Sequence, residues 1–386
     1  MTEKRNKPTI AVHAGRMSKA HFGAVNTPVY RASTILFPDV ETVEHGKPEY
    51  VYGRLGTPTS RSLEEALSEL QGGARTVLCP SGLSAVTTAI LAVVGAGDHL
   101  LVTDSCYGPA RLFCEQTLKR FGVDVTYYDP LIGAGIADLF HDNTKAVFCE
   151  SPGSLTFEVQ DVPAIARAAH ARGASVLMDN TWATPFFFDA FAHGVDLVFH
   201  SGSKYLGGHA DVVMGWVTAN EPHRTQLEDI HHHLGVCIGG DDCYLALRGL
   251  RTMNVRLKQQ QQTALTLARW LERRPEVARV LHPAMEADPG HTLWRRDFTG
   301  SSGLFGLLFH PVSKSALATF VDKLSYFGIG YSWGGYESLI VPAHFTRTAR
   351  PFGGQGPLWR IHAGLEDADD LIGDLSAGFE RMRNAQ

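Results

Sequence analysis

The chain has 386 residues, of which 44% are hydrophobic and 19% are charged, a composition typical of a globular protein with two or three hydrophobic cores. Its 35 basic and 40 acidic residues give a net charge of −5, which argues against a nucleic-acid or anionic-membrane partner. No stretch reaches the ~18 uninterrupted apolar residues that a membrane helix needs.

The N-terminal residues lack the apolar run of a signal peptide. The six cysteines include no pair at CxxC spacing, and several lie in apolar stretches such as Val147–Cys149. Buried, reduced thiols in a long chain are typical of a cytoplasmic protein, which is the localisation that we expect.

Residues 1–57 contain few periodic patterns and many Pro and Gly breaks. We therefore predict an extended N-terminal arm. Structureless segments of this length are usually functional or bound to a partner.

Residues 58–250 alternate between helix and strand patterns. Leucines at helical spacing end at Gly72, a second helix is predicted from Ser81 to about Val94, and a third begins at Asp161. Short apolar strands are predicted at Thr76–Cys79, His99–Thr103, Val123–Tyr127, Lys145–Cys149, Ser175–Met178, Leu197–His200 and Val212–Val217. This alternation predicts an α/β domain with a mostly parallel sheet.

Residues 251–386 follow a different pattern. A long helix is predicted over 255–273, a strand over Leu304–Phe309, and a final helix with one apolar face. These elements predict a smaller α+β domain.

Lys204 follows the predicted strand that ends at His200, and Ser201, Gly202 and Ser203 separate the two. Open α/β sheets bind ligands at this carboxyl edge. Small hydroxyl residues beside a lysine suit a phosphate near a Schiff base. A surface loop with a solvated lysine has the same local pattern, so this motif alone leaves both readings open.

Asp179 ends a strand of purely apolar residues, and a buried carboxylate needs a cationic partner. The protonated nitrogen of a pyridine ring is such a partner. Read alone, Asp179 could instead cap the next loop. A third motif, Ser81-Gly82-Leu83, opens a predicted helix whose free amides suit a phosphate, although simple helix capping explains it equally well.

Taken together, these motifs resemble the Cys/Met-metabolism family of fold-type I enzymes that use pyridoxal 5'-phosphate (PLP). The resemblance covers nearly the whole chain from Thr27. Its most specific stretches are Tyr52–Thr59, Glu150–Asp161, Met178–Trp182, Arg296–Phe305, Tyr331–Leu339 and Arg360–Asp367. The stretches Tyr331-Ser-Trp-Gly-Gly and Arg296–Gly303 are similar to the branch of the family that performs β-elimination on cystathionine.

The resemblance implies a fold-type I architecture with a seven-stranded sheet, and it implies roles for individual residues. Lys204 would bind PLP covalently, Asp179 would pair with its ring nitrogen, and Tyr107 would stack on its ring. The phosphate would be held by Ser81, Gly82, Leu83, Ser201 and Ser203, with Tyr52 and Arg54 reaching it from a neighbouring subunit. Substrate would contact Arg360, Ser332, Trp333 and Tyr52.

The implied assembly is a homotetramer built from active dimers. Other readings remain: a γ-lyase, γ-synthase or sulfhydrylase of the same family, or a regulator that binds PLP without turnover. A nucleotide-binding protein is disfavoured because the sequence contains neither GxGxxG nor GxxxxGK[ST] where it is needed. We expect no metal site, since the consecutive His231, His232 and His233 point in three directions on a helix.

Overall fold

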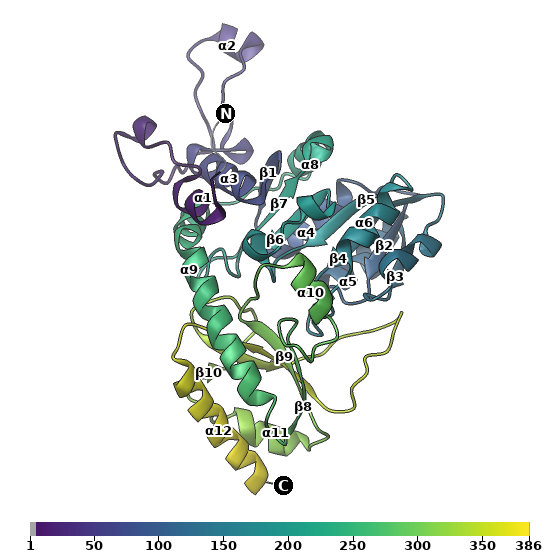
Figure 1. Ribbon diagram of the computed structural model, residues 1–386. Coiled ribbons are helices and arrows are strands. Elements are labelled where there is room, and N and C mark those ends of the chain that lie inside the picture. The colour runs from purple at the N-terminus through teal and green to yellow at the C-terminus, as the bar shows by residue number, and fades with distance from the viewer. Residues whose placement is uncertain (1–4, 386) are drawn as a thin grey trace.

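The computed structural model describes residues 5–385 and contains two sheets with helices packed on them (Figure 1). The larger sheet has the order β1 (Arg75–Cys79), β7 (Gly215–Ala219), β6 (Leu197–Ser201), β5 (Ser175–Asp179), β4 (Thr144–Glu150), β2 (His99–Thr103) and β3 (Asp124–Tyr128). Strands β6 to β3 are mutually parallel, whereas β7 runs antiparallel to both of its neighbours. The predicted seven-stranded, mostly parallel sheet is therefore confirmed.

The strands of this sheet are apolar because helices cover them. Each residue of β2 is buried, as expected for a parallel strand covered on both faces. Strand β7 begins at Gly215, three residues later than predicted, so the apolar pair Val212-Val213 belongs to the preceding loop. Val213 there is 66% exposed, which shows that this part of the apolar run does not enter the sheet.

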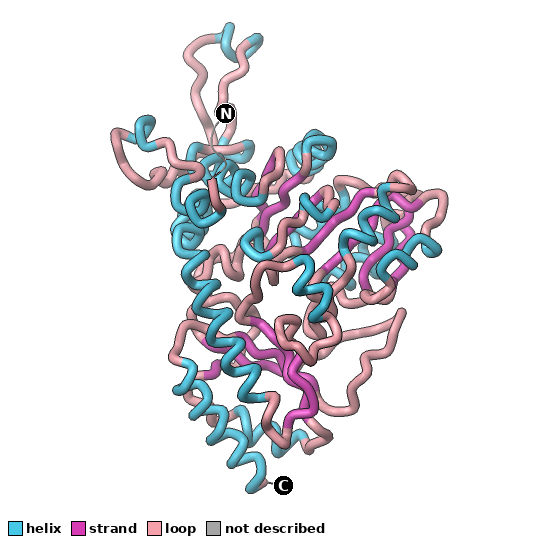
Figure 2. Tube along the Cα trace, in the orientation of Figure 1, coloured by secondary structure: helices cyan, strands magenta, loops and turns pink. Residues whose placement is uncertain are grey.

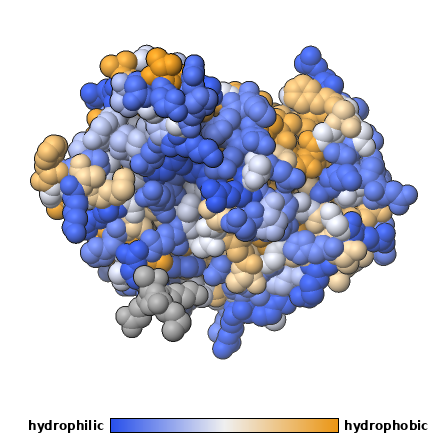
Figure 3. All heavy atoms as spheres, turned by 90° about the horizontal axis from the view of Figure 1, so that it is seen from above, coloured by the Kyte–Doolittle hydropathy of each residue, from blue (hydrophilic) through white to orange (hydrophobic). Residues whose placement is uncertain are grey.

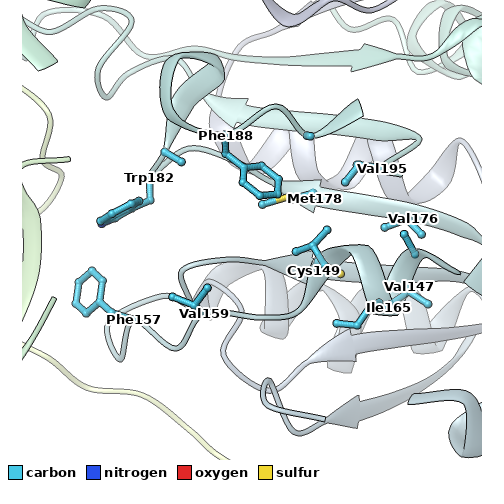
Figure 4. Packing of buried hydrophobic residues seen from close by; sticks show 14 of the residues in the cluster. Val147, Cys149, Phe157, Val159, Ile165, Val176, Met178, Trp182, Phe188 and Val195 are labelled. Carbon is cyan, nitrogen blue, oxygen red and sulfur yellow. The ribbon is translucent and has the colours of Figure 1, made fainter. Parts of the chain in front are cut away.

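The helices of this region are α3 (Pro58–Gln71), α4 (Gly82–Leu91), α5 (Gly108–Leu112), α6 (Val162–His170), α7 (Thr184–Phe187) and α8 (Arg224–His233). Local capping sets their ends. Thr57 forms a capping box at the start of α3, and Gly72 ends it with a φ of 76°. Asp161 caps α6, whose Ile165 packs beside Val147 and Val176 of the sheet (Figure 4).

The smaller sheet has the order β10 (Phe327–Gly328), β11 (Ser338–Pro342), β12 (Leu358–His362), β9 (Leu304–Phe309) and β8 (Val277–Leu281). Helices α10 (His291–Asp297), α11 (Lys314–Val321) and α12 (Ala368–Asn384) belong to the same region. The last helix has the predicted apolar face, which buries Leu375, Phe379 and Met382, whereas Ile372 is only partly buried.

One long helix, α9 (Gly240–Leu271), links the two regions (Figure 1). It begins 15 residues before the predicted helix. The predicted start was too late because Gly240 and Gly249 look like helix breaks in the sequence. The structure explains Gly249, since a Cβ there would lie 2.0 Å from the carbonyl oxygen of Leu206. The predicted domain boundary at residue 250 falls inside this helix and stays a prediction.

The N-terminal arm is less extended than predicted. Helix α1 (Lys7–His13) packs against α3 and α9, and it buries Ile10 and Ala11. Helix α2 (Val40–His45) and the 3₁₀ turns Ser18–His21 and Gly53–Leu55 interrupt the rest. Between them Phe22 and Leu36 are 104% and 88% exposed. Seen from above, the surface is mostly hydrophilic and carries separate hydrophobic groups (Figure 3). Within the described residues, no helix is long and apolar enough to cross a membrane.

A long loop, residues 343–357, joins β11 to β12 and reaches the larger sheet (Figure 2). There the carboxylate of Asp104 accepts hydrogen bonds from Arg111 and from the amides of Thr348 and Ala349 at 3.0 Å or less. Burial alone would raise the pKa of Asp104, but these donors lower it overall. The loop is therefore fastened to the larger sheet by a buried, ionised carboxylate.

The Asp104→Asn variant is expected to lose about 3–5 kcal/mol of unfolding free energy at neutral pH, because it removes the fully buried anion of Arg111 and leaves only the exposed Glu115 as its partner. The loss is measured by urea denaturation. The matched control is Glu115→Gln, which removes the other, 42% exposed partner of Arg111 and should cost less than about 1 kcal/mol. Equal losses in both variants would contradict the conclusion that the Asp104 carboxylate fastens the loop to the larger sheet.

The same carboxylate predicts a pH dependence. A lowered folded pKa means that Asp104 stabilises the protein above its ordinary pKa of 3.8 and that this contribution disappears as the pH falls below that value. The stability difference between the wild type and Asp104→Asn should accordingly shrink on acidification.

Candidate active site

The candidate site lies at the carboxyl edge of the larger sheet, where β4, β5 and β6 end at Glu150, Asp179 and Ser201. Asp179 lies in register with Phe199 on the neighbouring parallel strand. A turn after β6, closed by a hydrogen bond of 3.2 Å from the amide of Lys204 to the carbonyl of Ser201, returns Lys204 to this edge. The local chain path therefore brings the predicted lysine and aspartate to one edge.

The amine of Lys204 is held by a residue of the C-terminal region. Its Nζ donates to Oγ of Ser332 at 2.6 Å, and the carbonyl of Ser332 accepts from Arg360 at 2.8 Å. Ser332 has a φ of +73°, an uncommon conformation for a residue with a side chain, which often marks functional sites. Ser332 thus joins the predicted cofactor lysine to the predicted carboxylate clamp.

Trp333 and Gly334, the residues after Ser332, also lie close to Lys204. The Lys204 Nζ lies 5.5 Å from the ring centroid of Trp333, and that ring meets Tyr205 edge to face at 5.3 Å. Gly334 has a φ of +87°, and a Cβ at this position would lie 2.8 Å from the carbonyl carbon of Lys204. Gly334 is therefore needed for the close approach of this loop to Lys204.

The electrostatics of the site favour a partly deprotonated lysine. Burial, followed by the positive charge of Arg360, lowers the pKa of Lys204 to about 8, although Asp179 opposes the change. Burial also lowers the pKa of Arg360 to about 10. An amine that titrates near neutral pH can serve both as a nucleophile and as a base.

Asp179 accepts a hydrogen bond from the amide of Thr181 at 2.9 Å. Burial raises its pKa above the ordinary value, whereas Thr181 and the charge of Lys204 act in the opposite direction. Tyr107 belongs to the same electrostatic cluster: burial and then the charge of Asp179 raise the pKa of its phenol. The tyrosine, aspartate and lysine predicted from the sequence are therefore electrostatically coupled.

The start of helix α4 offers backbone amides to a ligand at the same edge. The Ser81 hydroxyl caps the helix by accepting from the amide of Ser84 at 3.0 Å, whereas the amides of Gly82 and Leu83 lie in the first turn, where a helix supplies no acceptor. A Cβ on Gly82 would lie 2.7 Å from Oγ of Ser201. The turn before α4 and the end of β6 are therefore adjacent, as a shared phosphate would require.

Two predicted groups have other contacts in the single chain. The hydroxyl of Ser203 accepts from the amide of Met214 at 2.9 Å and donates to its carbonyl at 3.2 Å. Arg54 donates to the carbonyl of His232 at 3.3 Å. Among residues 5–385, no hydrogen bond or ion pair connects Tyr52 or Arg54 to Lys204. The roles of Tyr52, Arg54 and Ser203 stay predictions, as do those of the other predicted site residues.

Glu150 is a residue of this edge to which sequence reasoning gave no role. It lies in register with Asp179, and its carboxylate accepts from the amide of Tyr107 at 2.7 Å. The available signal was its position, since Glu150 ends an apolar strand just as Asp179 does. Within the described residues, no group of three or more His, Cys, Asp or Glu side chains could hold a metal ion.

These residues fit PLP. The cofactor needs an amine for its aldehyde, an anion for its ring nitrogen and donors for its phosphate. Lys204 is a partly buried amine of lowered pKa, Asp179 is a partly buried carboxylate without a cation bonded to it in the described structure, and the first turn of α4 offers amides. Gly82 also leaves space beside Ser201 that a side chain would fill.

In the Arg360→Gln variant, the pKa of Lys204 is expected to rise toward its ordinary value, because a nearby positive charge is removed. The pH dependence of Lys204 modification by an amine-selective reagent, read by peptide mass spectrometry in cofactor-free protein, measures this change. The wild type should show a midpoint near pH 8. The control is Arg350→Gln, which removes an exposed arginine paired with Asp129. An unshifted midpoint in Arg360→Gln would count against the coupling.

Comparison with known proteins agrees with this geometry. Residues 8–380 match the family model described as "Cys/Met metabolism PLP-dependent enzyme". The chain is 45% identical to the cystathionine beta-lyase of Salmonella typhimurium, over 99% of this chain and 100% of that protein. It is also 45% identical to the cystathionine beta-lyase MetC of Escherichia coli, over 97% and 98%.

Among solved structures, a cystathionine gamma synthase from Xanthomonas oryzae pv. oryzae matches with a TM-score of 0.92 and 33% identity, covering 100% of both chains. This likeness confirms the predicted fold class. The chain belongs to the Cys/Met-metabolism family of PLP-dependent enzymes.

Proposed function

We propose that this protein is a carbon–sulfur β-lyase that cleaves L-cystathionine, or a related cysteine thioether, to a thiol, pyruvate and ammonia. The observation that carries the proposal is the contact of Lys204 with Ser332, whose carbonyl is bonded to Arg360. This contact places a proton-accepting amine beside a guanidinium that can hold an α-carboxylate. An α-amino acid bound by Arg360 therefore has its Cα near Lys204.

PLP bound at this site supplies an electron sink for negative charge at the substrate Cα. The protein supplies the rest. Arg360 binds the α-carboxylate through its planar fork and fixes the orientation of the Cα–H bond. Asp179 offers a negative charge that favours the protonated ring nitrogen.

Lys204 then acts as the general base, since a pKa of about 8 leaves part of the amine unprotonated at neutral pH. It takes the proton from Cα, and the electron pair moves to form the Cα–Cβ double bond as the Cβ–S bond breaks. The sulfur leaves as a thiolate and receives a proton from Lys204 or Tyr107. The three-carbon remainder reacts with water and ends as pyruvate and ammonia.

The choice of β- over γ-elimination rests on the two relatives named cystathionine beta-lyase and on Trp333, which contacts Lys204. A γ-lyase, γ-synthase or sulfhydrylase reaction is the alternative, and the Xanthomonas structure supports it. Chemistry at Cγ needs a second proton to be removed, from Cβ, and yields a four-carbon oxo acid. The products therefore separate the two reactions.

PLP-loaded protein mixed with L-cystathionine should release pyruvate and homocysteine, identified by mass spectrometry. The Lys204→Ala variant should lose about 1,000-fold or more in kcat, because the general base is removed. The control variant Lys314→Ala changes an exposed lysine at the start of α11 and should keep full activity. Release of 2-oxobutyrate and cysteine would instead assign the protein to the γ-lyases.

The assembly proposed for this enzyme is a homotetramer of active dimers in which Tyr52 and Arg54 complete the site of the neighbouring subunit. Three features support it. Tyr52 is 44% exposed, Arg54 forms no ion pair within the described residues, and the arm that carries both exposes Phe22 and Leu36. An arginine of this kind can bind a phosphate presented by a second chain.

A mixing experiment tests this shared site. Lys204→Ala and Arg54→Ala should each be inactive alone. If the two residues act across a dimer interface, random exchange of subunits should restore about a quarter of wild-type activity, because half of the dimers then contain one intact site. If Arg54 serves its own chain, each site in a mixed dimer lacks one residue and the mixture stays inactive.

A further inference from the structure

Glu150 carries a carboxyl group at the active edge that the proposed reaction does not use. It ends β4 in register with Asp179 on β5. Its Oε2 accepts from the backbone amide of Tyr107 at 2.7 Å, and within the described residues this is the hydrogen bond that its side chain makes. One carboxyl group therefore links the end of the sheet to the residue expected to stack on the cofactor.

The charges around Glu150 are unevenly distributed. Asp179 faces it from β5, Cys106 and Tyr107 from the segment after β2, and Arg347 from the loop over 343–357. Arg347 is the sole cation of this set, and it pairs with Glu158 at 3.0 Å. Within the described structure, Glu150 thus lies beside an anion and has no cation of its own.

Burial and then the negative charge of Asp179 raise the pKa of Glu150 well above its ordinary value, while the amide of Tyr107 and the charge of Arg347 oppose the change. A protonated carboxyl group keeps a carbonyl oxygen that can accept a hydrogen bond. The contact with Tyr107 therefore does not depend on the ionisation of Glu150.

We propose that Glu150 is a positioning residue for the cofactor: it fixes the backbone of Tyr107 at the end of the sheet and would thereby orient the Tyr107 ring, which is expected to stack on PLP. Glu150 acts here as a neutral hydrogen-bond acceptor. This role rests on the proposed function only in that Tyr107 and Asp179 contact PLP.

The test compares three variants by two measurements on PLP itself, without substrate. Titration of cofactor-free protein with PLP gives its Kd, and visible circular dichroism reports how the bound ring is held. Glu150→Ala removes the acceptor and should raise the Kd roughly 5- to 10-fold, the effect of one lost hydrogen bond, and it should weaken the dichroic band. Glu150→Gln keeps a neutral acceptor and should match the wild type in both.

The control is Glu158→Gln, a nearby acid that pairs with Arg347 and does not contact Tyr107. It should leave the dichroic band unchanged even if stability falls. A wild-type Kd and band in Glu150→Ala would overturn the proposal. Because the readouts use only PLP, they give an answer whether or not cystathionine is the substrate.

A pH titration of the visible absorbance of the bound cofactor tests whether Glu150 is neutral, and it does so even if Glu150→Ala fails to fold. A neutral Glu150 predicts the same midpoint in Glu150→Gln and in the wild type. An ionised Glu150 predicts a lower midpoint in the variant, by about one unit, because a neighbouring anion that stabilises the protonated form is lost. The lower midpoint would contradict the proposal.

Discussion

The site depends on the partial burial of two opposite charges, Asp179 and Lys204, at the carboxyl edge of neighbouring parallel strands. Neither charge is directly neutralised by the other: Asp179 is bonded to Thr181, and Lys204 is bonded to Ser332. Burial raises the pKa of the carboxyl group and lowers the pKa of the amine. A ligand with a cationic nitrogen can pair with Asp179, and an electrophilic carbon on the same ligand can react with Lys204. The PLP of this family is such a ligand.

The C-terminal region completes the site rather than merely covering it. Ser332 and Arg360 both come from that region. Ser332 holds the Lys204 amine, and the charge of Arg360 adds to burial in lowering its pKa. The loop over 343–357 and helix α9 hold the two regions together through Asp104 and through the close approach of Gly249 to Leu206. In the proposed reaction, substrate binding by Arg360 and proton transfer by Lys204 are therefore linked through Ser332 as well as electrostatically.

The sequence predicts much of this arrangement because strand ends are visible in it. Asp179 and Lys204 each follow an apolar run, so their place at one edge follows from parallel strands, and β2 and β9 have the predicted limits. The contact of Ser332 with Lys204 spans 128 residues and depends on tertiary packing that no local pattern encodes. The sequence predicts too short a helix α9, because its glycines allow close packing and do not end the helix. The docking of α1 likewise depends on its packing against both α3 and α9, which no local sequence pattern encodes.

Glu150 shows a further limit of sequence reasoning. Its strand-end position resembles that of Asp179, but its partner is the backbone of Tyr107, and a backbone amide leaves no mark in the sequence. For Tyr52 and Arg54 the sequence is more informative than the structure. Both residues match the family pattern, but one chain alone cannot display a site that is shared between subunits.

The account rests most directly on the identity of the lysine that carries the cofactor. PLP-loaded protein would be reduced with borohydride, which makes the bond between cofactor and lysine permanent, and then digested and mapped by mass spectrometry. The account predicts that the label lies on the peptide containing Lys204. A label on another lysine, or unlabelled Lys204 in fully loaded protein, would contradict it.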